Sequence, residues 1–411
     1  MTLLARTPIM NATAASLALV AAGCGEDVVA PAVCPDFCPA ATLIVVDTVI
    51  PASIERDSSY VGYVAAYAAK RMQVARDSAF DSDGMFRFQS FIDEINGPPV
   101  AGPVVAVDSF RLQFDIARRS RATDSTEIVV HRLPAEIDAT WTYDDLQPYF
   151  EDSTEIGAVL LPDSLEADSV SVILPGDAFP ALEEDSSSVT AVGLAYRSAQ
   201  PGFVDLITSD SSFIATILIR YVQIDSSESG VQVPAADTVL VLYDSFVFPQ
   251  PTVADPTTLT VGSSPSIRTF LRTNLPSRIV DSSSVVRATV LLVPSEPVLG
   301  VTGDSILIYV DALSADVGAK SPVIGLLPGL SAASVGFVAA GQTDTIRIEV
   351  TEVVRAWKFG ATLPRTLSLR AFNEGGSATE ARFHSSRSTL GVPILQVSFV
   401  PPVVLQLEGG Q

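Results

Sequence analysis

The run of residues 345–399 constrains the fold most, because its side chains alternate between apolar and polar with a period of two. Alternation of this kind places successive side chains on opposite faces of an extended strand, so that one face is buried and the other solvated. The first such run is Ile346, Arg347, Ile348, Glu349 and Val350. Further runs follow at 367–371, 381–383 and 394–399. The segment therefore predicts four strands of a sheet with one buried face.

A short helix is predicted between the first two of these strands. Thr351 is a residue type that caps helix N-termini, and Glu352 is an acid in the first turn, where it is favoured. Val353, Val354 and Trp357 share one helical face by their spacing. A helix of this length is not stable in isolation, so we expect its Trp357 face to pack on a β-sandwich.

Four features of this segment occur together in a known family. They are a Val-Thr step into the helix, a Trp inside it, a Phe-x-Ser step and a Pro-x-Leu-x-Val closing strand: Val350-Thr351, Trp357, Phe383-His384-Ser385 and Pro393-Ile394-Leu395-Gln396-Val397. In these features the segment resembles the C-terminal half of the bacterial DNRLRE-type β-sandwich domain. The resemblance implies a fold related to jelly-roll carbohydrate-binding modules, in a secreted or cell-surface protein.

A weaker copy of the same order precedes this segment. The run 170–174 corresponds to the strand before the helix, 192–196 to the strand after it, and 216–221 to the closing strand. Earlier strands also match in order: 85–88 with 268–272, 110–116 with 286–291, and 128–130 with 306–310. Tandem duplication followed by divergence is the simplest explanation.

Composition agrees with this interpretation, because charged residues make up only 18% of the chain while turn-forming residues are frequent. We therefore predict an all-β protein of two tandem jelly-roll-like β-sandwich domains after a signal peptide and a short tether. The predicted parts are a lipoprotein signal peptide at 1–23, a tether at 24–41, a first sandwich at 42–223, a linker at 224–235, a second sandwich at 236–402 and a tail at 403–411.

The N-terminus has the pattern of a targeting segment. Residues 9–22 are apolar and small, too few to span a bilayer but sufficient for the core of a signal peptide. They end in Val20-Ala21-Ala22-Gly23-Cys24, which resembles a bacterial lipobox. The resemblance implies that Cys24 carries the lipid; the alternative is ordinary cleavage near Ala22. Gly25 after the cysteine favours the outer membrane, so we predict an exported, lipid-anchored protein of the cell envelope.

Two further cysteines follow, Cys34 and Cys38. An exported chain meets oxidising conditions, so these two could close a small disulfide loop. They are too few for a zinc site, because no histidine or further cysteine lies near them.

Charge excludes some partners. The chain has 25 Lys and Arg against 47 Asp and Glu, a net charge of −22. Nucleic acids and anionic membrane surfaces require basic patches, so neither is expected as a partner.

The sequence contains no catalytic or cofactor signature, and we predict no enzyme activity and no cofactor. His131 and His384 are the chain's two histidines, and they belong to different predicted domains. Asp81 and Asp83 begin a Ca²⁺-loop pattern that lacks its downstream acid, so a turn is the better interpretation. The acid runs 144–145 and 183–185 could serve a glycoside hydrolase, but solvated surface is the stronger interpretation for both.

Aromatic side chains are the remaining candidates for binding. Trp141, Tyr143 and Tyr149 lie between predicted strands, which favours a loop at one end of a sandwich, where they could stack on sugar rings. A second group, at positions 60, 63 and 67, also suits an inward helical face. Core packing remains the default interpretation for these aromatic residues.

Three functions therefore follow from the sequence. The first is a non-catalytic, lipid-anchored envelope protein with a structural, adhesion or display role, whose partner would be the membrane or another envelope protein. The second is a polysaccharide-binding protein that uses Trp141, Tyr143 and Tyr149. The third is an envelope glycoside hydrolase, which the missing catalytic set disfavours.

Overall fold

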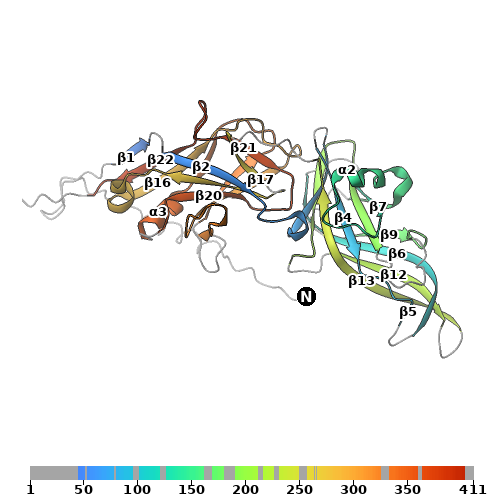
Figure 1. Ribbon diagram of the computed structural model, residues 1–411. Coiled ribbons are helices and arrows are strands. Elements are labelled where there is room, and N and C mark those ends of the chain that lie inside the picture. The colour runs from blue at the N-terminus through green and yellow to red at the C-terminus, as the bar shows by residue number, and fades with distance from the viewer. Residues whose placement is uncertain are drawn as a thin grey trace, which may run out of the picture. The chain divides into compact units, whose positions relative to one another are not determined.

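A computed structural model shows a mostly β protein built from antiparallel sheets (Figure 1). It describes residues 45–50, 53–77, 80–95, 101–120, 126–161, 169–179, 190–211, 216–225, 231–249, 257–262, 264, 266–324, 333–359 and 363–402. The strands form two groups. We call residues 71–247 the first lobe, and residues 46–61 together with 258–400 the second lobe.

The second lobe has two sheets. The four-stranded sheet has the order β1 (Val46–Val49), β22 (Ile394–Val400), β16 (Ser284–Leu292) and β19 (Ile346–Glu349). The other has the order β18 (Ala333–Ala339), β17 (Ser305–Ala312), β20 (Thr366–Ala371), β15 (Ile267–Thr273), β14 (Thr258–Gly262) and β21 (Glu380–His384), with β2 (Ile54–Val61) paired to β15.

The first lobe has one continuous network of strands. Its order is β13 (Gln232–Val247), β12 (Thr216–Asp225), β6 (Gly102–Arg119), β11 (Gly202–Ile207), β3 (Arg71–Asp77), β4 (Phe80–Phe88), β10 (Thr190–Arg197), β7 (Glu127–Leu133) and β8 (Glu155–Leu160). Two further strands, β5 (Glu94–Ile95) and β9 (Ser169–Pro175), pair with β6, and β13 also pairs with β4.

Helical segments are short in the part of the chain that the structure describes. They are η2 (Ala66–Ala68), α2 (Tyr143–Leu146), η3 (Gln147–Tyr149), η4 (Asp152–Thr154), η5 (Arg278–Ser282), η6 (Gly318–Lys320) and α3 (Thr351–Phe359). None of the described helices is long and apolar enough to cross a membrane.

Each lobe has its own hydrophobic core, as the alternating pattern predicts. In the second lobe both sheets contribute to one cluster: Val290, Ile348 and Leu395 come from the four-stranded sheet, and Ile308 and Leu369 from the other. The first lobe buries a second cluster that is rich in phenylalanine, with members on β4, β6, β10 and β12. The β-rich prediction is therefore confirmed.

The helix predicted after Val350 is present as α3, and Thr351 is its first residue. The Thr351 hydroxyl accepts a hydrogen bond from the Ala288 amide of β16 at 2.9 Å, so this side chain joins the helix to the sheet. Trp357 is only 3% exposed and belongs to the second-lobe core. The helix therefore covers that core, as its apolar face predicts.

Strand partners differ from the grouping that the sequence suggested. The sequence placed residues 42–61 in the first domain, but β1 pairs with β22 and β2 pairs with β15, both in the second lobe. The predicted linker 224–235 overlaps β12 and β13, where Ile224 stands opposite Val233 in an antiparallel pair. Alternation defines which face of a strand is buried but not which strand lies beside it, and this explains the difference.

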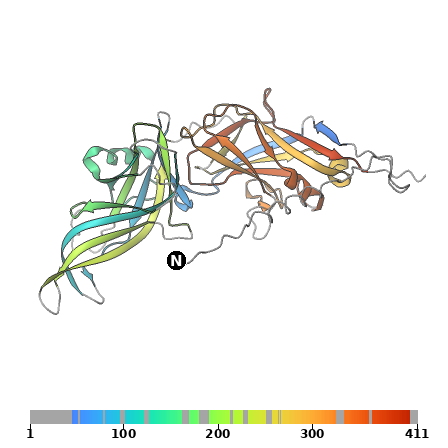
Figure 2. The same ribbon diagram turned by 180° about the vertical axis from the view of Figure 1, so that it is seen from behind.

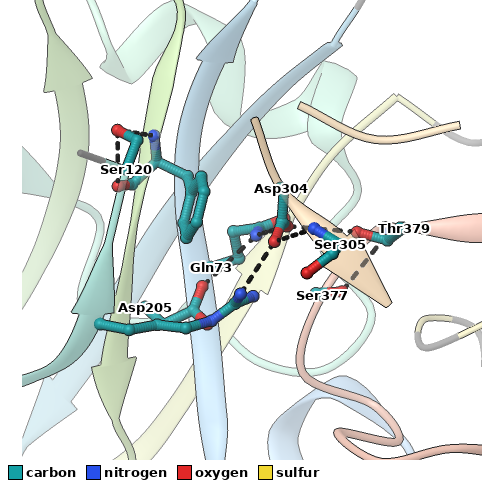
Figure 3. A network of polar contacts seen from close by, with 9 residues as sticks. Gln73, Ser120, Asp205, Asp304, Ser305, Ser377 and Thr379 are labelled. Atoms are coloured by element: carbon teal, nitrogen blue, oxygen red, sulfur yellow. Dashed lines mark hydrogen bonds and ion pairs between the residues drawn. The ribbon is translucent and has the colours of Figure 1, made fainter. Parts of the chain in front are cut away.

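The two lobes meet through a buried polar network (Figure 3). Gln73 of β3 donates from Nε2 to Asp304 Oδ2 at 2.7 Å. Arg118 of β6 contacts Asp304 Oδ1 at 2.9 Å and also pairs with Asp205 of β11. Asp304 follows the turn at residues 302–303 and directly precedes β17, so each lobe supplies part of one charged cluster. Burial raises the pKa of Asp205 to about 6, which the Arg118 guanidinium opposes.

We predict that Trp357→Ala destabilises the protein by about 3–5 kcal/mol, because it removes a large buried side chain from the second-lobe core. Urea denaturation followed by circular dichroism measures this change. Glu352→Ala is the matched control on the same helix, since its side chain is mostly exposed, and we expect a change within about 1 kcal/mol. Equal effects of the two substitutions would contradict the role given to Trp357.

Candidate functional site

The candidate site is built around the segment 134–154, which joins β7 to β8 and contains α2, η3 and η4. Figures 1 and 2 show this helical segment beside β7. Thr142 caps α2: its hydroxyl accepts from the Asp145 amide at 3.4 Å, and the Thr142 amide donates to Asp145 Oδ2 at 2.9 Å. Asp138 accepts from the Thr140 amide at 2.8 Å. These local bonds hold Trp141 between two fixed turns.

An open hollow of about 710 Å³ lies against this segment. Its walls combine aromatic rings with hydroxyl groups from stretches that are far apart in the sequence. The lining residues on the segment itself are Ala139, Thr140, Trp141, Thr142, Tyr143 and Asp144. The others are Ala65, Ala66, Tyr67, Met85, Tyr243, Ser245, Phe246, Val247, Phe248, Pro249 and Ser264. We call this feature the aromatic hollow.

The rings of the aromatic hollow are partly accessible. Tyr67 is 48% exposed, and its ring lies 6.3 Å from that of Tyr243, while Trp141 and Tyr143 are half-buried. Arg87 lies over the Tyr243 ring at 5.7 Å and donates to a backbone carbonyl of the 134–154 segment. Each ring thus has one face or edge against protein and another toward the hollow, which is typical of sites for amphipathic ligands.

The predicted aromatic residues are placed unequally. Trp141 and Tyr143 both line the aromatic hollow. Tyr149 is outside its lining but supports it, because its ring lies 6.1 Å from the Trp141 ring. All three also pack against a small core cluster that includes Leu133, so they have a structural role as well.

The second aromatic group divides between two places. Tyr60 and Tyr63 pack against a second-lobe cluster that contains Phe270. Tyr67 lies in η2 and enters the aromatic hollow. Tyr243 was not predicted from the sequence. A register shift between Val241 and Tyr243 places Tyr243 opposite Arg87, and simple alternation along β13 does not predict this.

Asp81 and Asp83, the weak Ca²⁺ candidates, lie within strand β4, so the turn predicted for them is wrong, and both pair with an arginine. Arg76 Nη1 lies 2.9 Å from Asp81 Oδ2, and Arg76 Nη2 lies 3.2 Å from Asp83 Oδ1. The guanidinium thus supplies the positive charge that a Ca²⁺ ion would bring. Among the described residues, no cluster of three or more possible metal ligands is found.

This charged pair supports the wall of the aromatic hollow. The Tyr143 hydroxyl donates to Asp81 Oδ2 at 3.5 Å, and Gln147 Nε2 donates to Asp83 Oδ2 at 3.4 Å. Burial raises the pKa of Asp83 to about 7, and the Arg76 charge opposes this rise. Burial, together with the nearby Asp81 charge, raises the pKa of Tyr143 to about 12, so Tyr143 stays a neutral donor.

The histidines have structural partners. His131 is 5% exposed, its Nδ1 lies 3.2 Å from Thr154 Oγ1, and burial lowers its pKa. His384 Nδ1 lies 3.3 Å from the Ser388 hydroxyl, on the second lobe. They are on different lobes and each serves its own turn, so no shared proton-transfer site arises from them.

The predicted acidic pair 144–145 lies in the same segment as Trp141. Asp144 is exposed and lines the aromatic hollow, whereas Asp145 serves the helix cap. Cys24, Cys34, Cys38 and the acid run 183–185 lie outside the described residues, as does the predicted tail 403–411.

Comparison with known proteins identifies no family for this chain. No family model matches the chain, and no curated protein matches it. Among solved structures, the Macrobrachium rosenbergii nodavirus is 10% identical, with 92% of this chain and 97% of that chain covered and a TM-score of 0.15. The infectious bursal disease virus Gx strain is 12% identical, with 91% and 82% covered and the same TM-score. Similarity at this level carries no functional information.

We predict that Asp83 makes stability depend on pH. Its folded-state pKa of about 7 lies above the 3.8 of a free aspartate side chain. The stability linked to its protonated form is therefore complete below pH ~4 and is lost as pH rises through about 7. Asp83→Asn cannot ionise, so its stability relative to the native protein should rise by about 2 kcal/mol between pH 5 and pH 8.

Urea denaturation at the two pH values tests this prediction. Ser82→Ala is the matched control, because it removes a buried neutral hydroxyl next to Asp83. Its effect on the free energy of unfolding should be the same at both pH values. If Asp83→Asn also gave a constant difference, the assigned titration would be wrong.

Proposed function

We propose that this chain is a non-catalytic, lipid-anchored protein of the bacterial cell envelope that binds polysaccharide in the aromatic hollow of its first lobe. The observation that carries the proposal is the convergence of Trp141, Tyr143, Tyr67 and Tyr243 on one open hollow of about 710 Å³.

The chemistry of the hollow suits a sugar. The C–H faces of a pyranose ring stack on aromatic rings, and its hydroxyls need donors and acceptors at the edge. Thr140, Thr142 and Ser245 also line the hollow. The Thr140 and Thr142 hydroxyls donate to Asp138 and Asp145, so they would act as acceptors toward a ligand. The Tyr243 hydroxyl is buried beside the Ser245 side chain, so Tyr243 offers its ring rather than its hydroxyl to a ligand.

The local structure favours binding by a preformed site. Capping bonds of Thr142 and Asp145 fix the segment that carries Trp141 and Tyr143. The Asp81–Arg76 pair holds the Tyr143 hydroxyl from behind. A ligand would therefore meet rings that are already ordered, which lowers the entropic cost of binding.

The scaffold is proposed to be a pair of jelly-roll-like β-sandwiches of the DNRLRE type. Support comes from the second lobe, where two antiparallel sheets share one core. The residues that carry the resemblance lie in consistent places: Val350 leads into α3, Trp357 is buried, and 394–397 opens the closing strand β22.

A purely structural or display role is the second candidate. It is favoured by the packing of Trp141, Tyr143 and Tyr149 against the core cluster around Leu133 and Leu146. In this role the aromatic residues would close the end of the first lobe without binding a ligand, and the envelope contact would come through the lipid or another envelope protein.

We expect Trp141→Ala to weaken polysaccharide binding by roughly 30-fold in Kd, which corresponds to about 2 kcal/mol for a central aromatic contact. A glycan array identifies the ligand, and isothermal titration with that glycan gives the Kd. Phe337→Ala is the matched control, because Phe337 is 66% exposed on the second lobe, away from the hollow lining. Absence of any glycan binding, or equal binding by both variants, would leave the structural role as the better explanation.

The anchor is tested separately. We expect Cys24→Ser to move the exported protein from the membrane fraction to the soluble fraction, because lipid attachment requires the thiol. Cys34→Ser is the matched control and should leave the protein in the membrane fraction. Retention of the Cys24→Ser variant in membranes would show that the lipobox interpretation is wrong.

A further inference from the structure

Strands of the two lobes correspond one to one in chain order. If β5 is left aside, β3, β4 and β6 to β12 correspond to β14, β15 and β16 to β22. The first-lobe order β12-β6-β9 matches β22-β16-β19. The order β8-β7-β10-β4-β3-β11 matches β18-β17-β20-β15-β14-β21. Every one of these neighbours is antiparallel in both lobes.

The two lobes differ in the strand that pairs with the remaining edges of two corresponding strands. In the first lobe this strand is β13: residues 232–240 pair with β12, and residues 241–247 pair with β4. In the second lobe the corresponding partners are β22 and β15, and they are paired by β1 and β2. In the second lobe, β1 and β2 together therefore occupy the position that β13 occupies alone in the first lobe.

Chain order makes this pairing unexpected. In a simple tandem repeat, β1 and β2 would open the first unit and β13 the second. Instead β13 completes the unit before it, and β1 and β2 complete the unit that follows the whole first lobe. The opening strands of the two units have thus changed places.

We propose that the chain is a tandem repeat with reciprocally exchanged opening strands, and that the edges of β22 and β15 form an interaction surface for the β1–β2 segment of a second copy of this chain. The same sequence that fits this surface within one molecule fits it in another, as in domain swapping. The interaction is strand addition to exposed sheet edges.

The recognition is specific because it uses side chains as well as backbone. Ile50 and Ile54 enter the second-lobe core. The Leu395 amide donates to Ser53 Oγ at 2.7 Å. Asp57 is 4% exposed and accepts the Ser386 amide. An unrelated strand would leave these groups unpaired, so only a copy of the same segment restores all of them.

The segment β1–β2 is better suited to exchange than β13. A hairpin joins β13 to β12, with Asp225 opposite Gln232, so β13 remains with its own lobe. In contrast, β1 lies at the edge of its sheet, and β2 pairs with β15 alone. Between β2 and the first lobe, Gly62 has a φ of +93°, and the space where a side chain would lie is open. This glycine provides a position at which the connection can turn.

Concentration decides which pairing forms. The connection within one chain gives the segment a high effective concentration near its own lobe, so the pairing within one molecule dominates in dilute solution. Chains that fold together at high concentration, as on a crowded membrane, complete each other instead.

A cross-linking experiment on the full chain tests the proposal. Asp47 and Ser398 stand opposite each other on β1 and β22, and their side chains are in contact. In a background with Cys24, Cys34 and Cys38 replaced by serine, one population carries Asp47→Cys and another Ser398→Cys. The two are mixed, unfolded in urea, refolded together at increasing concentration and treated with a short bismaleimide.

We expect a covalent heterodimer of about twice the 43.3 kDa chain mass, and we expect its share to rise in proportion to concentration. Glu349→Cys replaces Ser398→Cys in the matched control, because β19 is two strands further from β1 in the same sheet, and no heterodimer is expected. A single chain with both substitutions, cross-linked before mixing, should not exchange.

Two results would overturn the proposal. One is absence of heterodimer at every concentration, when circular dichroism shows that both variants have refolded. The other is equal cross-linking by Ser398→Cys and Glu349→Cys, which would indicate random collision.

Discussion

The pairing of β2 with β15 is the constraint on which the rest of the structure depends. Ser59 and Thr269 are 210 positions apart, yet their hydroxyls meet at 2.7 Å in the middle of this pair. Closing so long a loop costs conformational entropy, and buried bonds to Ser53 and Asp57 offset part of that cost. Because β2 is fixed at one end of the first lobe and β14 at the other, the whole first lobe is held as an insertion.

Local structure could be predicted from the sequence, and long-range pairing could not. The alternation in 345–399 predicted strands β19, β20, β21 and β22, and the Trp357 face predicted a docked helix. The pairing partners of β1, β2 and β13 could not be predicted from the sequence, because an alternating strand fits any sheet edge with a matching buried face. The repeat was visible in the sequence, but its exchanged strands required the register of the pairs.

In the candidate site too, the local features could be predicted from the sequence and the long-range contacts could not. Trp141 and Tyr143 could be selected because they are aromatic residues between strands, where loops form. Tyr243 and Tyr67 belong to other stretches of the chain, and only the fold brings them to the aromatic hollow. The Asp83 carboxylate illustrates a further limit: its pKa depends on burial beside Arg76, which the Asp-Ser-Asp-Gly pattern does not reveal.

The aromatic hollow and the strand exchange are connected through the backbone. One wall comes from 65–67, which follows β2, and another from 243–249, which ends β13. Residues 65–67 lie between β2 and the first lobe, and residues 248–249 follow β13 at the end of that lobe. A ligand that contacts both walls binds best when β2 and β13 are both paired, and by linkage it stabilises that arrangement. Binding in the hollow and pairing of the exchanged strands would therefore be coupled.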